Sequence, residues 1–205
     1  YKNTPSIKSI LLSNYFVDFN DFQTALARLK LANSISIQNN IYSINTSRTL
    51  FLEYQFKPLM KFISSAKRRI LICDEVGLGK TIEAGLIINE LEARKELNTA
   101  LIVVPANLRR KWQDELLYRF KKDFNIIGAN DFKGIIEEDK TYYNKYKHNR
   151  FIVSLESIRS DKLMAAIDDS DFQWDLLIVD EAHNLRNMSK QHNSIKKLSI
   201  NCQAI

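Results

Sequence analysis

Residues 74–81 read Asp-Glu-Val-Gly-Leu-Gly-Lys-Thr, and a helix-forming stretch, 82–94, follows them. Glycines let backbone N–H groups turn around a phosphate, and a helix N-terminus adds partial positive charge. A strict phosphate-binding loop has glycine where this chain has Asp74. The alternative is an ordinary strand-to-helix turn with an exposed lysine. The residues expected to bind the phosphates of a nucleotide are Gly77, Leu78, Gly79, Lys80, Thr81 and Ile82.

Two acidic residues, Asp180 and Glu181, follow a short apolar run further along the chain. Acidic side chains at the end of a buried strand are costly unless they meet a cation or hydrogen-bond donors, so their position favours a functional site. We expect Asp180 and the Thr81 hydroxyl to bind Mg²⁺, and Glu181 to orient and deprotonate an attacking water. Lys80, Asp180 and Glu181 are therefore the predicted catalytic residues. His183 either links the nucleotide state to a second lobe or caps the following loop.

A parallel sheet is needed to bring these segments together. From Leu50 onward, short apolar runs alternate with longer amphipathic ones, which is typical of such a sheet flanked by helices. The sequence predicts buried strands at 69–73, 100–104, 125–127, 151–154 and 176–179, and helices near 55–66, 81–96, 107–120 and 156–167. We therefore expect an α/β fold in which helices sandwich the sheet and ligands bind at the carboxyl ends of its strands.

Two segments lie outside this pattern. Residues 1–47 form a predicted accessory segment with one amphipathic helix around 21–29, whose apolar face carries Phe22, Leu26 and Leu29. Residues 137–148 are polar and aromatic, and predict a surface excursion between strands. The expected domains are thus the accessory segment, 1–47, and the nucleotide-binding lobe, 48–205.

The bulk composition is that of a soluble globular protein: of 205 residues, 45% are hydrophobic and 26% are charged. The formal net charge of +6 favours a polyanionic partner. Cys73 and Cys202 are far apart and in no metal-ligand spacing, so we expect two buried thiols in a reducing, cytoplasmic compartment. No apolar stretch is long enough to cross a bilayer, so no membrane association is expected.

The motif series resembles the first RecA-like lobe of superfamily-two helicases, and within them the Swi/Snf-type translocases of the bacterial HepA-like branch. Residues 74–85 are similar to the first motif of that branch and differ from the loops of DEAH-type RNA helicases. Residues 104–113 resemble motif Ia and 154–157 resemble motif Ib. Residues 52–55 resemble the segment that reads adenine, so the resemblance implies that Gln55 hydrogen-bonds the base. The resemblance to this family covers roughly residues 48 to 190.

This resemblance implies an ATP hydrolase that uses Mg²⁺ and moves along double-stranded DNA, with ATP held between this lobe and a second RecA-like lobe. Arg109, Arg110 and Lys111 stand near the family's contacts to the DNA backbone, but they equally fit an ordinary solvated helix face. Trp112 is expected to pack against the core rather than stack on a base. The chain starts at Tyr1 and ends before a third motif, so we expect a fragment with little ATP hydrolysis of its own.

Two other functions fit the same residues. One is the lobe of a strand-separating or restriction-type helicase, and the other is a nucleotide-dependent binding module that seldom hydrolyses ATP. All three depend on one expectation, which is that Lys80 and Asp180 face a common cleft.

Overall fold

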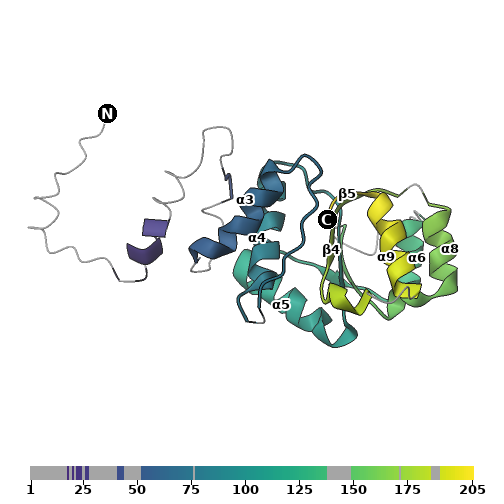
Figure 1. The fold of residues 1–205 in the computed structure, drawn as a ribbon. Helices are drawn as coiled ribbons and strands as arrows, with labels where there is room; N and C mark the ends of the chain where they lie inside the picture. The colour runs from purple at the N-terminus through teal and green to yellow at the C-terminus, as the bar shows by residue number, and fades with distance from the viewer. Residues whose placement is uncertain are drawn as a thin grey trace, which may run out of the picture.

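The computed structural model describes residues 18, 20, 22–24, 26–27, 41–43, 52–75, 77–137, 149–170, 172–185 and 190–205. Figure 1 shows the arrangement of these residues as a central sheet with helices on both sides. The predicted class, an α/β fold with a parallel sheet sandwiched by helices, is confirmed.

Three strands form the centre of the sheet: β1 (Ala100–Val104), β3 (Arg150–Ser154) and β4 (Trp174–Val179). Two short strands flank them, β2 (Asn125–Ile126) and β5 (Cys202–Ala204), giving the order β2-β3-β1-β4-β5. Every pairing between these strands is parallel. Val103 of β1 pairs with Val153 on one side and Val179 on the other, so the carboxyl ends of the three central strands meet at one edge.

Helices cover the two faces of the sheet in separate groups (Figure 1). The first group is α3 (Phe56–Ser64), α4 (Lys80–Ala93) and α5 (Arg109–Phe120). The second group is α6 (Ala129–Ile136), α8 (Asp161–Asp168) and α9 (Lys190–Ile200). Short 3₁₀ turns lie at Glu53–Gln55 (η2), Ala106–Leu108 (η3), Ser157–Arg159 (η4) and Ala182–Leu185 (η5).

Alternation along the buried strands divides the core into two clusters, because successive side chains point to opposite faces. Ile102 of β1 packs in the cluster under α3, α4 and α5, and Val103 packs in the cluster under α6, α8 and α9. In the second cluster, Trp174 lies 4.7 Å from Phe172 and 6.1 Å from Phe132, measured between ring centroids. Side chains therefore fill the space between the sheet and the helices on both faces. A ligand is expected at the edge where the strands end.

The predicted strand at 69–73 is wrong. This segment makes backbone hydrogen bonds with the last residue of the sequence, from Ile70 N to Ile205 O (2.9 Å) and from Ile205 N to Arg68 O (3.0 Å). A ladder needs a partner along its whole length, and among the described residues no assigned strand lies beside 71–73. Exposure alternates along the segment, so Cys73 is exposed and was wrongly expected to be buried. Cys202 is buried, and burial raises the pKa of its thiol to about 11.

Other expected elements differ in extent. The helix expected at 156–167 is a 3₁₀ turn, η4, followed by α8. Helices α6 and α9 were not among the elements predicted from the sequence. Near the N-terminus, Phe22 and Leu26 are 57% and 38% exposed, so the expected apolar face is not buried there, while Leu29 and residues 138–148 lie outside the described residues. Across the described ranges, no helix is long and apolar enough to cross a membrane.

Residues 41–43, within the predicted accessory segment, are bonded to the middle of the lobe. The Glu90 carboxylate on α4 is 1% exposed and accepts hydrogen bonds from Tyr42 N (3.1 Å) and Ser43 N (2.9 Å). Arg94 donates to the same carboxylate at 2.8 Å and lies 5.1 Å from the centre of the Tyr42 ring. A buried carboxylate is stable only when it is paired, so these bonds stabilise the turn at 41–43 on α4.

Gly85 sets the distance between α4 and α5. A Cβ at this position would lie 2.2 Å from Cε2 of Phe120, whose ring is 1% exposed, so the packing would have to shift. We expect Gly85→Ala to lower the free energy of unfolding by about 1–3 kcal/mol in a urea titration, although alanine favours helices. The control is Gly128→Ala, where φ is −92° and no heavy atom lies within 4 Å of the added carbon. A Gly85→Ala variant as stable as the wild type would contradict this packing.

Candidate nucleotide site

The predicted phosphate loop is a tight turn that leads into α4. Gly77 and Gly79 have φ angles of +94° and +97°, a left-handed conformation that residues with a Cβ rarely adopt. Leu78 N donates to Glu75 O at 3.4 Å, and Ile82 N donates to Gly79 O at 2.7 Å, which starts the helix. The first N–H groups of a helix have no partner inside it, so this end of α4 can bind an anion.

Lys80 folds back over the loop. Its ammonium donates to the backbone carbonyls of Asp74 (2.9 Å) and Glu75 (3.3 Å). These carbonyls are weaker partners than an anionic phosphate would be, because charge-assisted hydrogen bonds are the stronger ones. A phosphate at the loop would therefore compete for the Lys80 ammonium.

The acidic pair lies directly after β4, as predicted. Asp180 N donates to Val103 O at 2.9 Å, which continues the pairing of β4 with β1 by one residue. The Asp180 carboxylate accepts two hydrogen bonds, from Glu181 N to Oδ1 and from Trp112 Nε1 to Oδ2, both at 2.8 Å. Glu181 has φ of +52°, an uncommon angle for a residue other than glycine, and strained backbone of this kind tends to occur at functional sites. Its Oε2 lies 3.0 Å from His183 Nδ1.

The loop and the acidic pair share one cavity of about 320 Å³, a size at the lower end of small-molecule sites. Lys80 and Asp180 thus face a common cleft, as the sequence analysis required. Leu78 is not in its lining. The lining residues from the two motifs are Gly77, Gly79, Lys80, Thr81, Ile82, Asp180 and Glu181.

Helix α5 supplies the remaining wall, which sequence reasoning missed. Glu115 and Arg119 line the cavity together with Leu108, Lys111 and Trp112, at the three- and four-residue spacing of one helix face. Trp112 is 4% exposed, so it packs in the core as expected, and it also bonds to Asp180. The helical spacing from Lys111 to Glu115 and Arg119 was readable in the sequence, but nothing there indicated which helix faces the acidic pair.

The basic cluster at the start of α5 divides between two cavities. Lys111 faces the cavity that contains Lys80 and Asp180, whereas Arg109 and Arg110 line a second, more open cavity of about 510 Å³ with Ala106, Gln113, Asn125 and Ile126. Arg110 donates to Gln113 Oε1 at 2.8 Å, and Arg109 donates to Ala106 O at 3.2 Å. The three residues therefore do not form a single basic face.

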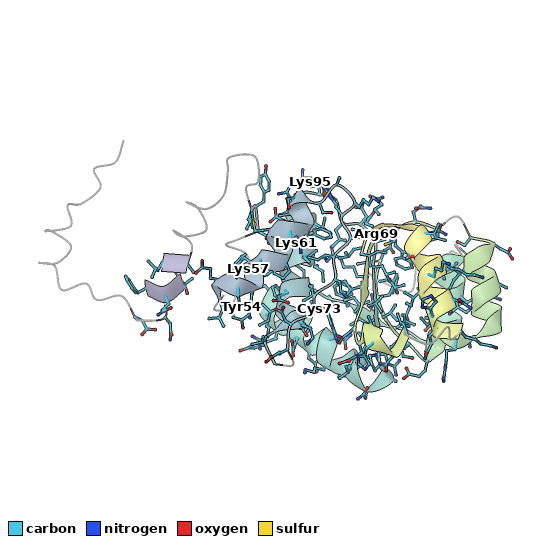
Figure 2. The ribbon with its side chains drawn as sticks, viewed as in Figure 1. Tyr54, Lys57, Lys61, Arg69, Cys73 and Lys95 are labelled. Atoms are coloured by element: carbon cyan, nitrogen blue, oxygen red, sulfur yellow. The ribbon has the colours of Figure 1, made fainter. Side chains whose placement is uncertain are left out.

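Gln55 is 3% exposed, which excludes the reading of a solvated helix residue. Its amide nitrogen donates to Leu78 O at 3.3 Å, and its amide oxygen accepts from Leu52 N at 3.3 Å. Tyr54, labelled in Figure 2, donates its hydroxyl to the same Leu78 carbonyl at 3.0 Å. A Cβ on Gly79 would lie 2.8 Å from the Gln55 amide nitrogen, so the segment at 52–55 packs directly on the phosphate loop.

Beneath the loop, Glu83 on α4 is fully buried. Burial, the largest cause, and the neighbouring Asp74 carboxyl, through hydrogen bonding and charge, together raise the pKa of the Glu83 carboxyl to about 7, although Lys80 lowers it. Glu83 is therefore neutral over part of the range in which most carboxyl groups are ionised. A neutral acid can share a proton with Asp74 at the start of the loop.

The residues at the cavity suit magnesium bound with phosphate. In the described part of the chain, no group of three or more His, Cys, Asp or Glu residues could hold a metal ion. Mg²⁺ is usually bound by one or two protein oxygens together with substrate phosphates and water, rather than by an all-protein cage. The Thr81 hydroxyl and the Asp180 carboxylate, both at the cavity, are oxygen donors of that kind.

Comparison with known proteins identifies the family of this chain. A profile of the SNF2-related domain matches residues 31–204, most of the chain. The chain belongs to the SNF2-related family. Family membership implies, in general terms, an ATPase that binds a nucleotide and typically a divalent metal ion. The match begins at residue 31, so it includes the turn at 41–43 that is bonded to α4.

The SNF2-related fold is also found in a solved structure described as the Sulfolobus solfataricus SWI2/SNF2 ATPase core in complex with dsDNA. The TM-score is 0.53 at 19% sequence identity, over 80% of this chain. At this identity the similarity establishes the RecA-like fold. The match covers 31% of the Sulfolobus chain, so the present sequence spans about a third of that protein's length.

Glu83 predicts a pH-dependent stability. Because its folded pKa of about 7 lies above its ordinary value of 4.5, the stability contributed by the protonated acid is complete below pH 4.5 and is lost as the pH rises through 7. Glu83→Gln keeps a neutral side chain at every pH. We expect its thermal midpoint to exceed that of the wild type at pH 8 by several degrees, and to equal it near pH 4.5.

The matched control is Glu53→Gln, which removes an exposed carboxylate outside the core. It should follow the wild type at both pH values. A Glu83→Gln variant whose midpoint keeps the wild-type dependence on pH would show that Glu83 is ionised in the folded protein.

Proposed function

We propose that residues 48–205 form the first ATP-binding lobe of a DNA-dependent ATPase that translocates on double-stranded DNA. The observation that carries the proposal is the single cavity lined by the phosphate loop and the acidic pair. It supports a site in which a triphosphate lies along the loop with its terminal phosphate toward Asp180 and Glu181. The family assignment supports the same reaction class.

Each residue then has a role that follows from its chemistry. The backbone N–H groups of Gly77, Gly79, Lys80 and Thr81, which line the cavity, bind the phosphates, and the Lys80 ammonium exchanges the Asp74 and Glu75 carbonyls for phosphate oxygens. Glu181 orients the attacking water and accepts its proton, a role for which its carboxylate must leave His183. Gln55 exchanges its bond to Leu78 for one to the base.

Magnesium, when bound, neutralises charge that develops on the phosphates. Thr81 and Asp180 would hold it by their side-chain oxygens. Asp180 has both oxygens already oriented by N–H donors, so its free lone pairs have a defined direction.

Duplex DNA is the proposed polyanionic partner. Arg109 and Arg110 line an open cavity with polar neighbours, which suits contacts to a phosphate backbone. The net charge of +6 favours the same class of partner, because binding to nucleic acid draws affinity from counterion release. The SWI2/SNF2 core to which this chain is similar was solved with double-stranded DNA, which supports the choice of duplex.

A second RecA-like lobe is the other proposed partner. Phosphoryl transfer depends on positioned positive charge, and an arginine supplied from another element contributes on the order of 10³–10⁵ in rate. In the proposed mechanism that arginine comes from the second lobe. Residues 1–205 alone are therefore proposed to bind ATP but to hydrolyse it slowly.

Lys80→Ala tests the phosphate role. Loss of a charge-assisted bond to phosphate should weaken ATP binding about 100-fold in a fluorescent-nucleotide titration. The thermal midpoint should change little, because Lys80 is only partly buried and its ammonium bonds to carbonyls of the exposed loop. Lys57→Ala, at an exposed lysine on α3 labelled in Figure 2, is the control and should bind ATP as the wild type does. Equal affinities in the two variants would refute the role of the loop.

Glu181→Gln tests the chemical step in the protein that carries both lobes. We expect the variant to bind ATP with unchanged affinity and to lose at least about 100-fold in duplex-stimulated hydrolysis, since a positioned base contributes about 10²–10⁴ in rate. Hydrolysis is measured by phosphate release with duplex DNA, single-stranded DNA or RNA. Stimulation by single strands or RNA only would contradict the duplex motor and favour a strand-separating helicase. Full biological activity of Glu181→Gln would favour a binding module.

A further inference from the structure

Trp112 connects two parts of the molecule that are distant in sequence. Its indole N–H donates to Asp180 Oδ2 at 2.8 Å, across 68 positions of the chain. The ring is 4% exposed and lies in the same core cluster as Leu116 and Phe120, which follow it on the buried face of α5. Packing therefore fixes the direction of the N–H group relative to α5.

The other hydrogen bond to the Asp180 carboxylate is local. Its donor is the backbone N–H of Glu181, the next residue, so it moves together with Asp180. The indole bond is different in kind, because it ties the carboxylate to a separate helix. Any shift of α5 relative to β4 must either carry the carboxylate with it or lengthen this bond.

Helix α5 also lines the second cavity through Arg109, one helical turn before Trp112. Arg109 and Arg110 face that cavity, while Lys111 and Trp112 face the cavity of the phosphate loop. A helix moves largely as a rigid unit, so a ligand that shifts its first turn also shifts Trp112. Helix α5 therefore carries the candidate DNA contacts, Arg109 and Arg110, and is joined to the candidate metal ligand, Asp180, by the hydrogen bond from Trp112.

We propose that Trp112 is a positioning residue for Asp180, and that it transmits duplex binding at Arg109 and Arg110 to the affinity of the site for magnesium. The proposal rests on the proposed function of both cavities. In this role Trp112 acts through the carboxylate that it orients. Partners of this kind typically contribute 10–100-fold to metal affinity.

The test compares three forms of the 205-residue chain: the wild type, Trp112→Phe and Trp174→Phe. Phenylalanine keeps an apolar ring but has no N–H donor. Trp174 is the matched control, because it is also a buried tryptophan, 1% exposed, but packs among Phe132, Phe151 and Phe172 in the other core cluster. Binding of a fluorescent ATP analogue is titrated against Mg²⁺, with and without a short blunt-ended DNA duplex, and thermal midpoints are recorded for each form.

Adding Mg²⁺ should raise the affinity for the ATP analogue, and the Mg²⁺ requirement is the concentration that gives half of this increase. We expect the Mg²⁺ requirement to rise about 10-fold or more in Trp112→Phe. Trp174→Phe should lower the thermal midpoint and leave the Mg²⁺ requirement unchanged. The duplex should lower the Mg²⁺ requirement of the wild type and have no such effect in Trp112→Phe. An unchanged Mg²⁺ requirement in Trp112→Phe, or an equal duplex effect in both forms, would overturn the proposal.

A second measurement leaves both tryptophans in place, in case a ring substitution prevents folding. Asp180→Ala removes the acceptor of the indole bond and should shift the tryptophan emission of the ligand-free chain, whereas Glu181→Gln should not. Identical emission in Asp180→Ala and the wild type would overturn the assignment. A wild-type chain that binds no ATP would refute the proposed function, and this inference with it. If the wild type binds ATP and Trp112→Phe keeps the wild-type Mg²⁺ requirement, only the inference about Trp112 is refuted.

Discussion

The parallel pairing of β1 with β4 is the constraint on which the site depends. The pairing ends with the bond from Asp180 N to Val103 O, so the acidic pair emerges at the carboxyl edge of the sheet. Helix α4 packs on the same sheet and begins at Lys80, and the cavity at this edge is lined by residues of both segments. Two motifs about a hundred residues apart are thus brought together by backbone hydrogen bonding and by burial of one helix.

Helix α4 buries two acidic side chains, which is uncommon in a protein interior. Residues 83–91 are all buried, and they include the two carboxyl groups of Glu83 and Glu90. Each is accommodated by a different means. Glu90 is paired with Arg94 and the N–H groups of the 41–43 turn, whereas the pKa of Glu83 is raised by burial and by Asp74. One end of the helix therefore holds part of the N-terminal segment, and the other end supports the phosphate loop with a carboxyl group whose charge depends on pH.

Much of this arrangement could be predicted from the sequence. Runs such as 100–104 are apolar and end at polar motifs, so the central strands and the positions of Lys80 and Asp180 followed from local pattern. The strand predicted at 69–73 failed because pairing is not a local property: the backbone hydrogen bonds that the described residues show for this segment run to Ile205, and no strand is assigned beside it there. Strand β5 is too short to give a periodic signal. The bond between Trp112 and Asp180, and the burial of Glu83, depend on tertiary packing that no spacing in the sequence encodes.

The most direct test of the central claim is a crystal structure of this chain with Mg²⁺ and a non-hydrolysable ATP analogue. We expect the Lys80 ammonium to leave the Asp74 and Glu75 carbonyls for the phosphates, and one metal ion to be bound by the Thr81 hydroxyl and the Asp180 carboxylate. A nucleotide bound elsewhere, for example in the cavity beside Arg109 and Arg110, with Lys80 still on its carbonyls, would contradict it.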